Sequence, residues 1–233
     1  MRRNLLLIAT VLYATISWSQ TMNIHYKNGQ TVQYNMNNID YVEYTEDNPN
    51  NAQVSSGEAV DLGLSVLWAN CNVGANSPEQ YGDKYAWAET SPKEKYNKSN
   101  YLYYDSNTES YIDIGMDIKG TDYDVAHVKW GGDWRMPTYA ELEELEYKCE
   151  WKWGQYNGVN GYVVTGSNSN SIFIPVGTND ICFWASEIAL PFNEGLNGTY
   201  FRAAHIVIRS GQKPGGWGGP RENGNYIRPV MPK

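Results

Sequence analysis

The sequence predicts an α+β domain made of many short strands and one or two helices, preceded by a small N-terminal β-hairpin unit. Three observations predict this class. Glycine (22 residues) and proline (10 residues) interrupt the chain throughout. Only two stretches have helical periodicity, and most other apolar residues fall in short runs typical of strands. Many short strands with few helices are characteristic of α+β domains.

Residues 1–19 have the pattern of a secretory signal. Arg2 and Arg3 precede an apolar run at 5–16, and small residues follow it up to Ser19. The run is shorter than the roughly 20 residues of a membrane-spanning helix, and no comparable run follows. We therefore expect cleavage after Ser19 and no membrane insertion of the product.

The expected product is exported to the periplasm, the cell surface or the medium, without a lipid anchor. A lipoprotein needs a cysteine at its new N-terminus, and the first cysteine here is Cys71. Removal of residues 1–19 takes away two arginines and no acidic residue, which changes the formal charge from −8 to −10. Such an acidic chain argues against nucleic acid or anionic lipid as partner, since both require a cationic surface.

Residues 20–46 predict a small β unit. Apolar and polar residues alternate on both sides of Asn28-Gly29, which is the strongest short signal for a hairpin. A third candidate strand follows at 39–44. An isolated sheet of this size is marginal in water, so we expect it to pack on the main domain or on a partner.

Residues 47–59 have the composition of a linker, rich in Asn, Ser, Asp and Pro. The main domain is therefore expected at 60–233. Its predicted strands are 161–165, 171–175, 181–186, 200–208 and 226–230.

The clearest helix signal begins at Thr138. Thr138 as N-cap and Glu141 three residues later form a capping box. Leu142, Leu145 and Cys149 then recur on one face. The pattern predicts an amphipathic helix of about three turns.

A shorter helix is predicted at 124–130, ended by the glycine pair that follows it. Asp122, Asp124 and His127 could gather metal ligands around one turn. An aspartate as a helix N-cap explains the same residues better. We therefore expect no metal and no other cofactor.

Several motifs occur in a fixed order: VDLGLSV at 60–66, WANCNVGA at 68–75, YGD and AWAET within 81–90, WGGDWRMPT at 130–138, FWAS at 183–186 and IRPV at 227–230. Together they resemble the Fibrobacter succinogenes major paralogous domain family of exported Bacteroidetes proteins. The resemblance covers residues 60–230. It implies a C-type lectin-like fold, similar to formylglycine-generating and sulfatase-modifying-factor domains: a twisted, mostly antiparallel sheet with one or two helices, long loops and termini brought together.

The motif residues are expected to be structural. Pro at the first helical position pre-sets a helix start. Arg135 is interpreted as a clamp that pairs with Glu141 or Glu144 or stacks on an aromatic ring, and Arg228 is given the same role. The structural set is Trp134, Arg135, Pro137, Thr138, Trp184 and Arg228, with Trp68 and Trp87 also expected in the core.

Three cysteines in an exported chain leave one unpaired. Cys71 lies in a family motif and Cys149 on the buried helix face, so we predict a disulfide between them, worth roughly 4 kcal/mol. Cys182 is then a buried free thiol.

No catalytic residues are predicted. The calcium-binding loop motifs of sugar-binding C-type lectins and the paired cysteines of formylglycine-generating enzymes are not recognisable here. With only His25, His127 and His205, no order of nucleophile, histidine and carboxylate can be argued.

The expected function is a non-catalytic recognition module that binds a glycan or a surface protein. Trp217 among glycines is the expected stacking ring, with Arg221, Asn223 and Asn225 as hydrogen-bonding partners. It is equally consistent with the sequence that this glycine-rich stretch is only a long connection. A structural subunit of a cell-surface assembly is the second candidate function, and an enzyme of the formylglycine-generating type is the third. The oligomeric state is left open.

Overall fold

The computed structural model describes residues 21–25, 31–35, 57–189, 202–216 and 218–233. The chain divides into two compact units, Met1–Asn50 and Asn51–Lys233. The division lies inside the segment 47–59. The signal segment, the Asn28-Gly29 turn and the third candidate strand at 39–44 lie outside the described residues.

In the first unit, β1 (Thr21–His25) pairs antiparallel with β2 (Thr31–Asn35). Ile24 lies opposite Val32, so the alternating apolar residues of the two strands are in register. The strand pairing of the predicted hairpin is confirmed.

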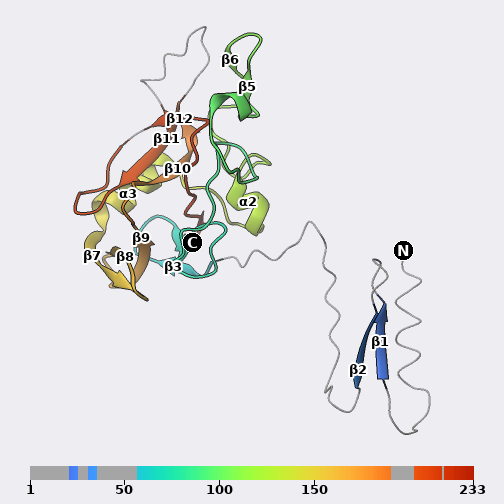
Figure 1. The fold of residues 1–233 in the computed structure, drawn as a ribbon. Helices are drawn as coiled ribbons and strands as arrows, with labels where there is room; N and C mark the ends of the chain where they lie inside the picture. The colour runs from blue at the N-terminus through green and yellow to red at the C-terminus, as the bar shows by residue number, and fades with distance from the viewer. Residues whose placement is uncertain (1–20, 26–30, 36–56, 190–201, 217) are drawn as a thin grey trace. The chain divides into compact units, whose positions relative to one another are not determined.

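In the second unit, the first sheet contains strands from both ends of the unit. Its strands are β3 (Ala59–Asp61), β4 (Leu67–Ala69) and β13 (Val230–Met231), in the order β13-β4-β3. Val230 lies opposite Trp68. The beginning and end of this unit therefore meet in one sheet (Figure 1).

The unit contains two further three-stranded sheets (Figure 1). One contains β7 (Glu150–Tyr156), β8 (Val159–Thr165) and β9 (Ser171–Pro175), and the other β10 (Ile181–Ile188), β11 (Arg202–Ile208) and β12 (Gly219–Pro220). A short ribbon pairs β5 (Tyr104–Asp105) with β6 (Ser110–Tyr111), after the 3-10 turn η2 (Lys98–Asn100). Every pairing between these strands is antiparallel, so the α+β class with mainly antiparallel sheet is confirmed.

The predicted long helix is α3 (Tyr139–Lys148). Pro137 precedes the N-cap Thr138, so its expected place at the first helical position was wrong. Thr138 accepts a hydrogen bond from the Glu141 backbone N–H, and the Glu141 carboxylate accepts one from the Thr138 N–H at 2.8 Å, which confirms the capping box. Leu142 and Leu145 are fully buried. The apolar stripe thus fixes this helix against β10 and β11.

The predicted short helix is α2 (Val125–Trp130). Its N-cap is Asp124, which is buried and accepts hydrogen bonds from the backbone N–H groups of Ala126, His127, Gly120 and Met136. Gly131 ends the helix at φ 68°, a left-handed conformation that glycine adopts without strain. The interpretation of an aspartate as the N-cap of this helix is therefore confirmed.

The described core contains three clusters: two larger ones on opposite faces of β10, and a small one of Ala86, Tyr101 and Tyr111. Phe183 faces the first cluster, with Leu142 and Leu145 of α3, and Trp184 faces the second, with Val125 of α2. Alternate residues of a strand point to opposite faces, and both faces of β10 are covered here. This explains the nearly continuous apolar character of 181–185.

Several strands differ from the sequence expectations. The short strands β3 to β6 and β12, of two or three residues each, were not predicted. Strand β7 was not predicted either, because most of its residues are polar. The predicted strand 226–230 forms isolated bridges, including Phe183 with Tyr226, and only Val230 enters a regular strand. The chain there runs through Pro229, which has no N–H to donate to a ladder.

Candidate functional site

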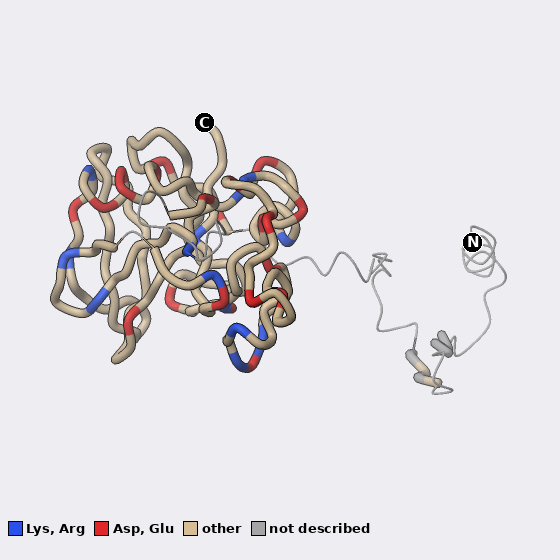
Figure 2. Tube along the Cα trace, turned by 90° about the horizontal axis from the view of Figure 1, so that it is seen from above, with Lys and Arg blue, Asp and Glu red and all other residues tan. Residues whose placement is uncertain are grey.

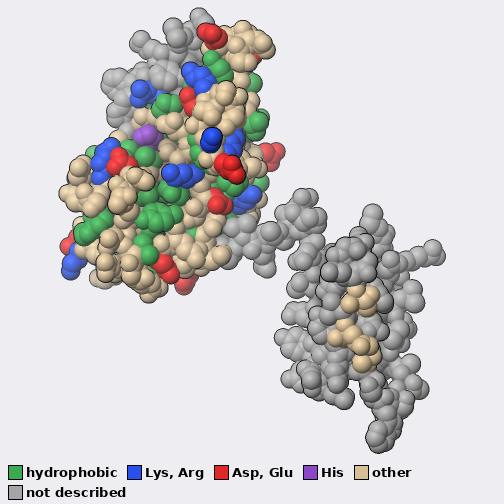
Figure 3. Space-filling view, in the orientation of Figure 1, with side chains coloured by type: hydrophobic (Ala, Val, Ile, Leu, Met, Phe, Trp, Pro, Cys, Tyr) green, Lys and Arg blue, Asp and Glu red, His purple; other side chains and the backbone are tan. Residues whose placement is uncertain are grey.

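A hollow of about 360 Å³ opens beside β7 and β8. Figure 3 shows hydrophobic side chains gathered on the part of the unit where Figure 1 places α3 and β7 to β9. The volume lies at the lower end of the roughly 300–1,000 Å³ of small-ligand sites. We call it the aromatic groove; it is lined by Trp151, Trp153, Tyr162, Gly211, Gln212, Lys213 and Pro214.

Three rings form one side of the aromatic groove. Tyr162 makes edge contacts with both tryptophans: the ring centroids are 5.6 Å from Trp151 and 4.9 Å from Trp153, with interplanar angles of 72° and 75°. Edge-to-face contacts of this kind are favourable between aromatic rings. Trp153 remains 39% exposed, so part of its surface is open to a ligand.

Strand geometry brings these rings together. Trp151 and Trp153 are two positions apart on β7 and therefore point to the same face. The register of β7 and β8 sets Trp153 opposite Tyr162. Trp151 is further fixed from α3, because its indole N–H donates a hydrogen bond of 3.0 Å to the carbonyl oxygen of Leu145.

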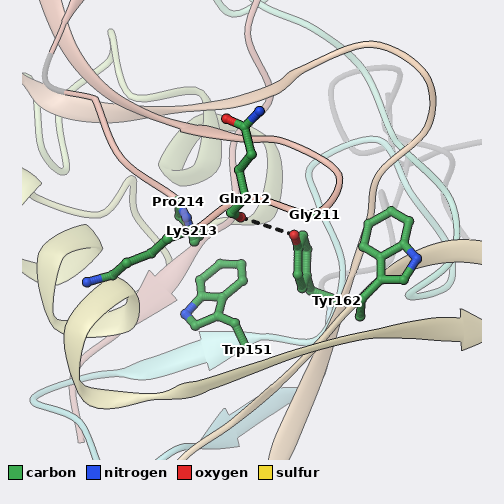
Figure 4. A pocket seen from close by; sticks show the side chains of 7 residues that line it. Trp151, Tyr162, Gly211, Gln212, Lys213 and Pro214 are labelled. Atoms are coloured by element: carbon green, nitrogen blue, oxygen red, sulfur yellow. Dashed lines mark hydrogen bonds between the residues drawn. The ribbon is translucent and has the colours of Figure 1, made fainter.

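The other side of the groove is the segment 211–214 (Figure 4). The Tyr162 hydroxyl reaches the carbonyl oxygens of Arg209 at 2.9 Å and Gln212 at 3.1 Å. Backbone hydrogen bonds between Val207 and Gly215 close the segment. The groove wall is thus held by the same tyrosine that contacts both tryptophans.

Lys213 is the charged residue among the seven that line the aromatic groove. Its ammonium lies 4.1 Å from the centroid of the Tyr147 ring, a cation–π contact with an exposed side chain of α3. None of the seven lining residues carries a carboxylate. Figure 2 shows acidic and basic residues distributed together over the rest of the unit.

Arg221, predicted as a ligand contact, is instead part of the interior. Only 2% of it is exposed. Its guanidinium lies over the rings of Trp87, Tyr101 and Tyr111 at 4.9, 5.6 and 5.5 Å, and Nε donates to the Tyr101 hydroxyl oxygen. The prediction was wrong because these rings, more than a hundred positions earlier, enclose the arginine.

Asn225 is also structural, and that prediction was wrong too. It is 6% exposed, and its backbone forms a bridge with Tyr85 through hydrogen bonds of 2.8 and 3.1 Å. Its side chain contacts the ring of His205 at 3.5 Å. Asn223 is exposed, as expected for a loop. Trp217 lies outside the described residues.

The expected clamp at Arg135 is present. Its two Nη atoms donate to the two carboxylate oxygens of Glu141 at 2.8 and 2.7 Å. Arg228 is fully buried and donates to oxygens of Asn72, Ala69 and Phe173. Its guanidinium lies 5.8 Å from the centroid of the Phe183 ring, which matches the aromatic alternative of the expected clamp. The expected core tryptophans Trp68, Trp87, Trp134 and Trp184 are all buried.

The predicted disulfide is not formed: Cys71, Cys149 and Cys182 are free. Cys71 Sγ contacts the carbonyl oxygen of Ala75 near Arg228, whereas Cys149 ends α3 and packs against the first core cluster. The two thiols are therefore held in different surroundings. Burial raises the pKa of all three, that of Cys149 to about 11.

Within the described ranges, no group of three or more His, Cys, Asp or Glu side chains is arranged to hold a metal ion. His205 is largely buried beside Trp184, and desolvation, with the charges of Arg202 and Arg209, lowers its pKa to about 4. The imidazole is therefore neutral at physiological pH. None of the described helices has the length and apolar character needed to span a bilayer.

Sequence reasoning missed Trp151, Trp153 and Tyr162. The available signal was the alternation Trp-Lys-Trp at 151–153, which is typical of a strand with a tryptophan-rich face. Comparison of the chain with protein-family models, curated proteins and solved structures finds no match.

Proposed function

We propose that this chain is an exported, non-catalytic recognition module that binds a carbohydrate in the aromatic groove. The observation that carries the proposal is the set of three rings, Trp151, Trp153 and Tyr162, at one opening with a partly exposed tryptophan. The C–H groups of a sugar ring form an apolar face that stacks on such rings, while its hydroxyls need polar partners. Gln212 and the backbone of 211–213 offer these.

The groove lining favours binding over catalysis. Hydrolysis of a glycoside ordinarily uses a pair of carboxylic acids that flank the scissile bond, and the seven lining residues include none. The Tyr162 hydroxyl is engaged by two carbonyl oxygens. A lining of this kind holds a ligand without transferring protons to it.

The proposal includes membership of the major paralogous domain family and its C-type lectin-like fold. Three features of the described residues support it: the antiparallel sheets, the pairing of β13 with β4, and the helix entry at Thr138. Export through the signal at 1–19 is part of the same proposal. A carbohydrate-binding role suits a chain that works outside the cytoplasm.

The test is a pair of substitutions on one strand. Trp153→Ala removes the most exposed ring of the groove, and Tyr156→Ala removes a 44% exposed ring from the opposite face of β7. Wild type and both variants are compared on a glycan array and by calorimetry, with thermal melting to verify folding. We expect the first variant to lose at least about tenfold in affinity, as for a stacked aromatic anchor, and the second to bind normally.

Two results contradict the proposal. Equal glycan binding by wild type and the folded Trp153→Ala variant places the site elsewhere. Trp217→Ala then tests the neighbouring glycine-rich stretch. Absence of binding to any host, plant or bacterial glycan points to a surface protein as partner.

A further inference from the structure

Lys213 gives the aromatic groove a charge opposite to that of the chain. The chain carries a formal charge of −8, yet its groove lining holds one lysine and no acidic residue. Figure 4 shows Lys213 on the same segment as Gln212, with its side chain extending past Trp151 and away from Tyr162. A ligand that stacks on Trp151 therefore meets this cation at the Trp151 end of the groove.

Lys213 takes part in none of the ion pairs of the described residues, whereas nearby Arg209 pairs with Asp180 at 2.9 Å. Its ammonium lies instead 4.1 Å from the centroid of the Tyr147 ring. An aromatic ring positions an ammonium without forming an ion pair with it, so Lys213 can still pair with a carboxylate of a ligand.

Two acidic residues of α3 lie near the Tyr147 ring. The charges of Glu146, which is buried, and of Glu143 raise the pKa of Tyr147. Tyr147 therefore stays a neutral phenol at physiological pH. Glu144 is paired with Lys148 and with the N–H of Ser65.

We propose that the aromatic groove is specific for an acidic saccharide, in which one sugar ring stacks on the tryptophans and its carboxylate is bound by Lys213. This inference rests on the proposed carbohydrate site. It deepens that proposal by naming the ligand class, a uronic-acid-containing oligosaccharide. The lysine supplies charge selectivity, and the rings supply binding common to acidic and neutral sugars.

The test uses the whole chain and pairs of oligosaccharides that differ only in charge. Galacturonate and glucuronate oligomers are compared with their carboxyl-reduced forms by calorimetry, at low and at high salt. The expected result is tighter binding of the acidic forms, with a preference of about threefold, as for an exposed ion pair. This preference weakens at high salt, because salt screens exposed charges.

Two matched variants isolate the charge. Lys213→Gln abolishes the preference, so that acidic and reduced forms bind with equal affinity, whereas Lys213→Arg retains it. Lys152→Gln removes the same charge from an exposed position on the opposite face of β7 and has no effect.

The outcomes separate the inference from the proposed function. Equal binding of acidic and reduced forms, or a preference that survives in Lys213→Gln, overturns the acidic specificity and leaves a carbohydrate site in place. Failure of wild type to bind either form of any oligosaccharide overturns both proposals.

Discussion

The guanidinium Nε of Arg228 donates a hydrogen bond of 2.7 Å to the side-chain oxygen of Asn72, 156 positions earlier in the chain. Both residues are buried. The remaining two guanidinium nitrogens donate to the carbonyl oxygens of Ala69 and Phe173. One side chain near the C-terminus therefore joins the first sheet to β9. Desolvation lowers its pKa to about 10, so it remains charged at neutral pH.

Arg228→Met is expected to destabilise the unit by about 3 kcal/mol, because it leaves the oxygens of Asn72, Ala69 and Phe173 buried without donors. Arg228→Lys should also destabilise, since an ammonium cannot reproduce the planar fork of donors. Urea unfolding measures both. A loss below about 0.5 kcal/mol, typical of an ordinary surface substitution, contradicts the assigned role.

Tyr162→Phe is expected to loosen the wall of the aromatic groove and leave its rings in place. The substitution removes the hydroxyl that reaches the carbonyl oxygens of Arg209 and Gln212, at a cost of about 1 kcal/mol in stability. Hydrogen exchange should increase at the amides of 210–213, and ligand affinity should fall. Tyr156→Phe, on the opposite face of β7, is the control. Unchanged exchange at these amides would show that the wall does not depend on Tyr162.

The protein is expected to lose stability in acid as the carboxylate of Glu144 becomes protonated. Hydrogen bonds from Lys148 and from Ser65 lower its pKa to about 2. Because this is below the ordinary value of 4.5, the unfolded state binds the proton more readily. The contribution of Glu144 is therefore fully present above pH 4.5 and is lost as the pH falls toward 2.

Glu144→Gln should accordingly be less stable than wild type at pH 7 and nearly equal to it near pH 2. Melting temperatures measured between pH 7 and pH 2 give the two curves. Glu143→Gln makes the same change of charge one position earlier and is the matched control for the loss of one carboxylate. A constant difference between Glu144→Gln and wild type at every pH would exclude this carboxylate as the source.

The three cysteines are expected to be reduced and slow to react. Burial raises the pKa of each thiol, and the thiolate is the reactive form. Iodoacetamide should therefore modify the native protein slowly and the unfolded protein rapidly. Mass spectrometry of the non-reduced chain is the check. A peptide cross-linked through Cys71 and Cys149 would show that the oxidised protein differs from the structure described here.

The elements that could be predicted from the sequence are those whose interacting residues lie close together in the chain. The capping box of Thr138 and Glu141 lies within one turn, and Asp124 caps α2 through neighbouring N–H groups. The clamp between Arg135 and Glu141 spans only six positions. In each case the residues that interact are close enough in the chain for their types and spacing to identify them.

The groove was missed because it depends on strand pairing. Trp151 and Trp153 form a site only when β8 sets Tyr162 between them and the chain returns at 211–214. Arg221 was misassigned for the same reason. A glycine-rich composition indicates an exposed loop, but the rings of Tyr101 and Tyr111 that bury Arg221 come from another part of the chain.

The pairing of β13 with β4 sets an order of events during synthesis. Trp68 emerges from the ribosome long before Val230, its partner in the sheet. Until then one edge of β4 lacks its partner β13, and the carbonyl oxygens of Ala69 and Phe173 lack the guanidinium of Arg228. The unit can complete its first sheet only after its last residues are made, and a chain shortened by even the four residues 230–233 loses that closing strand.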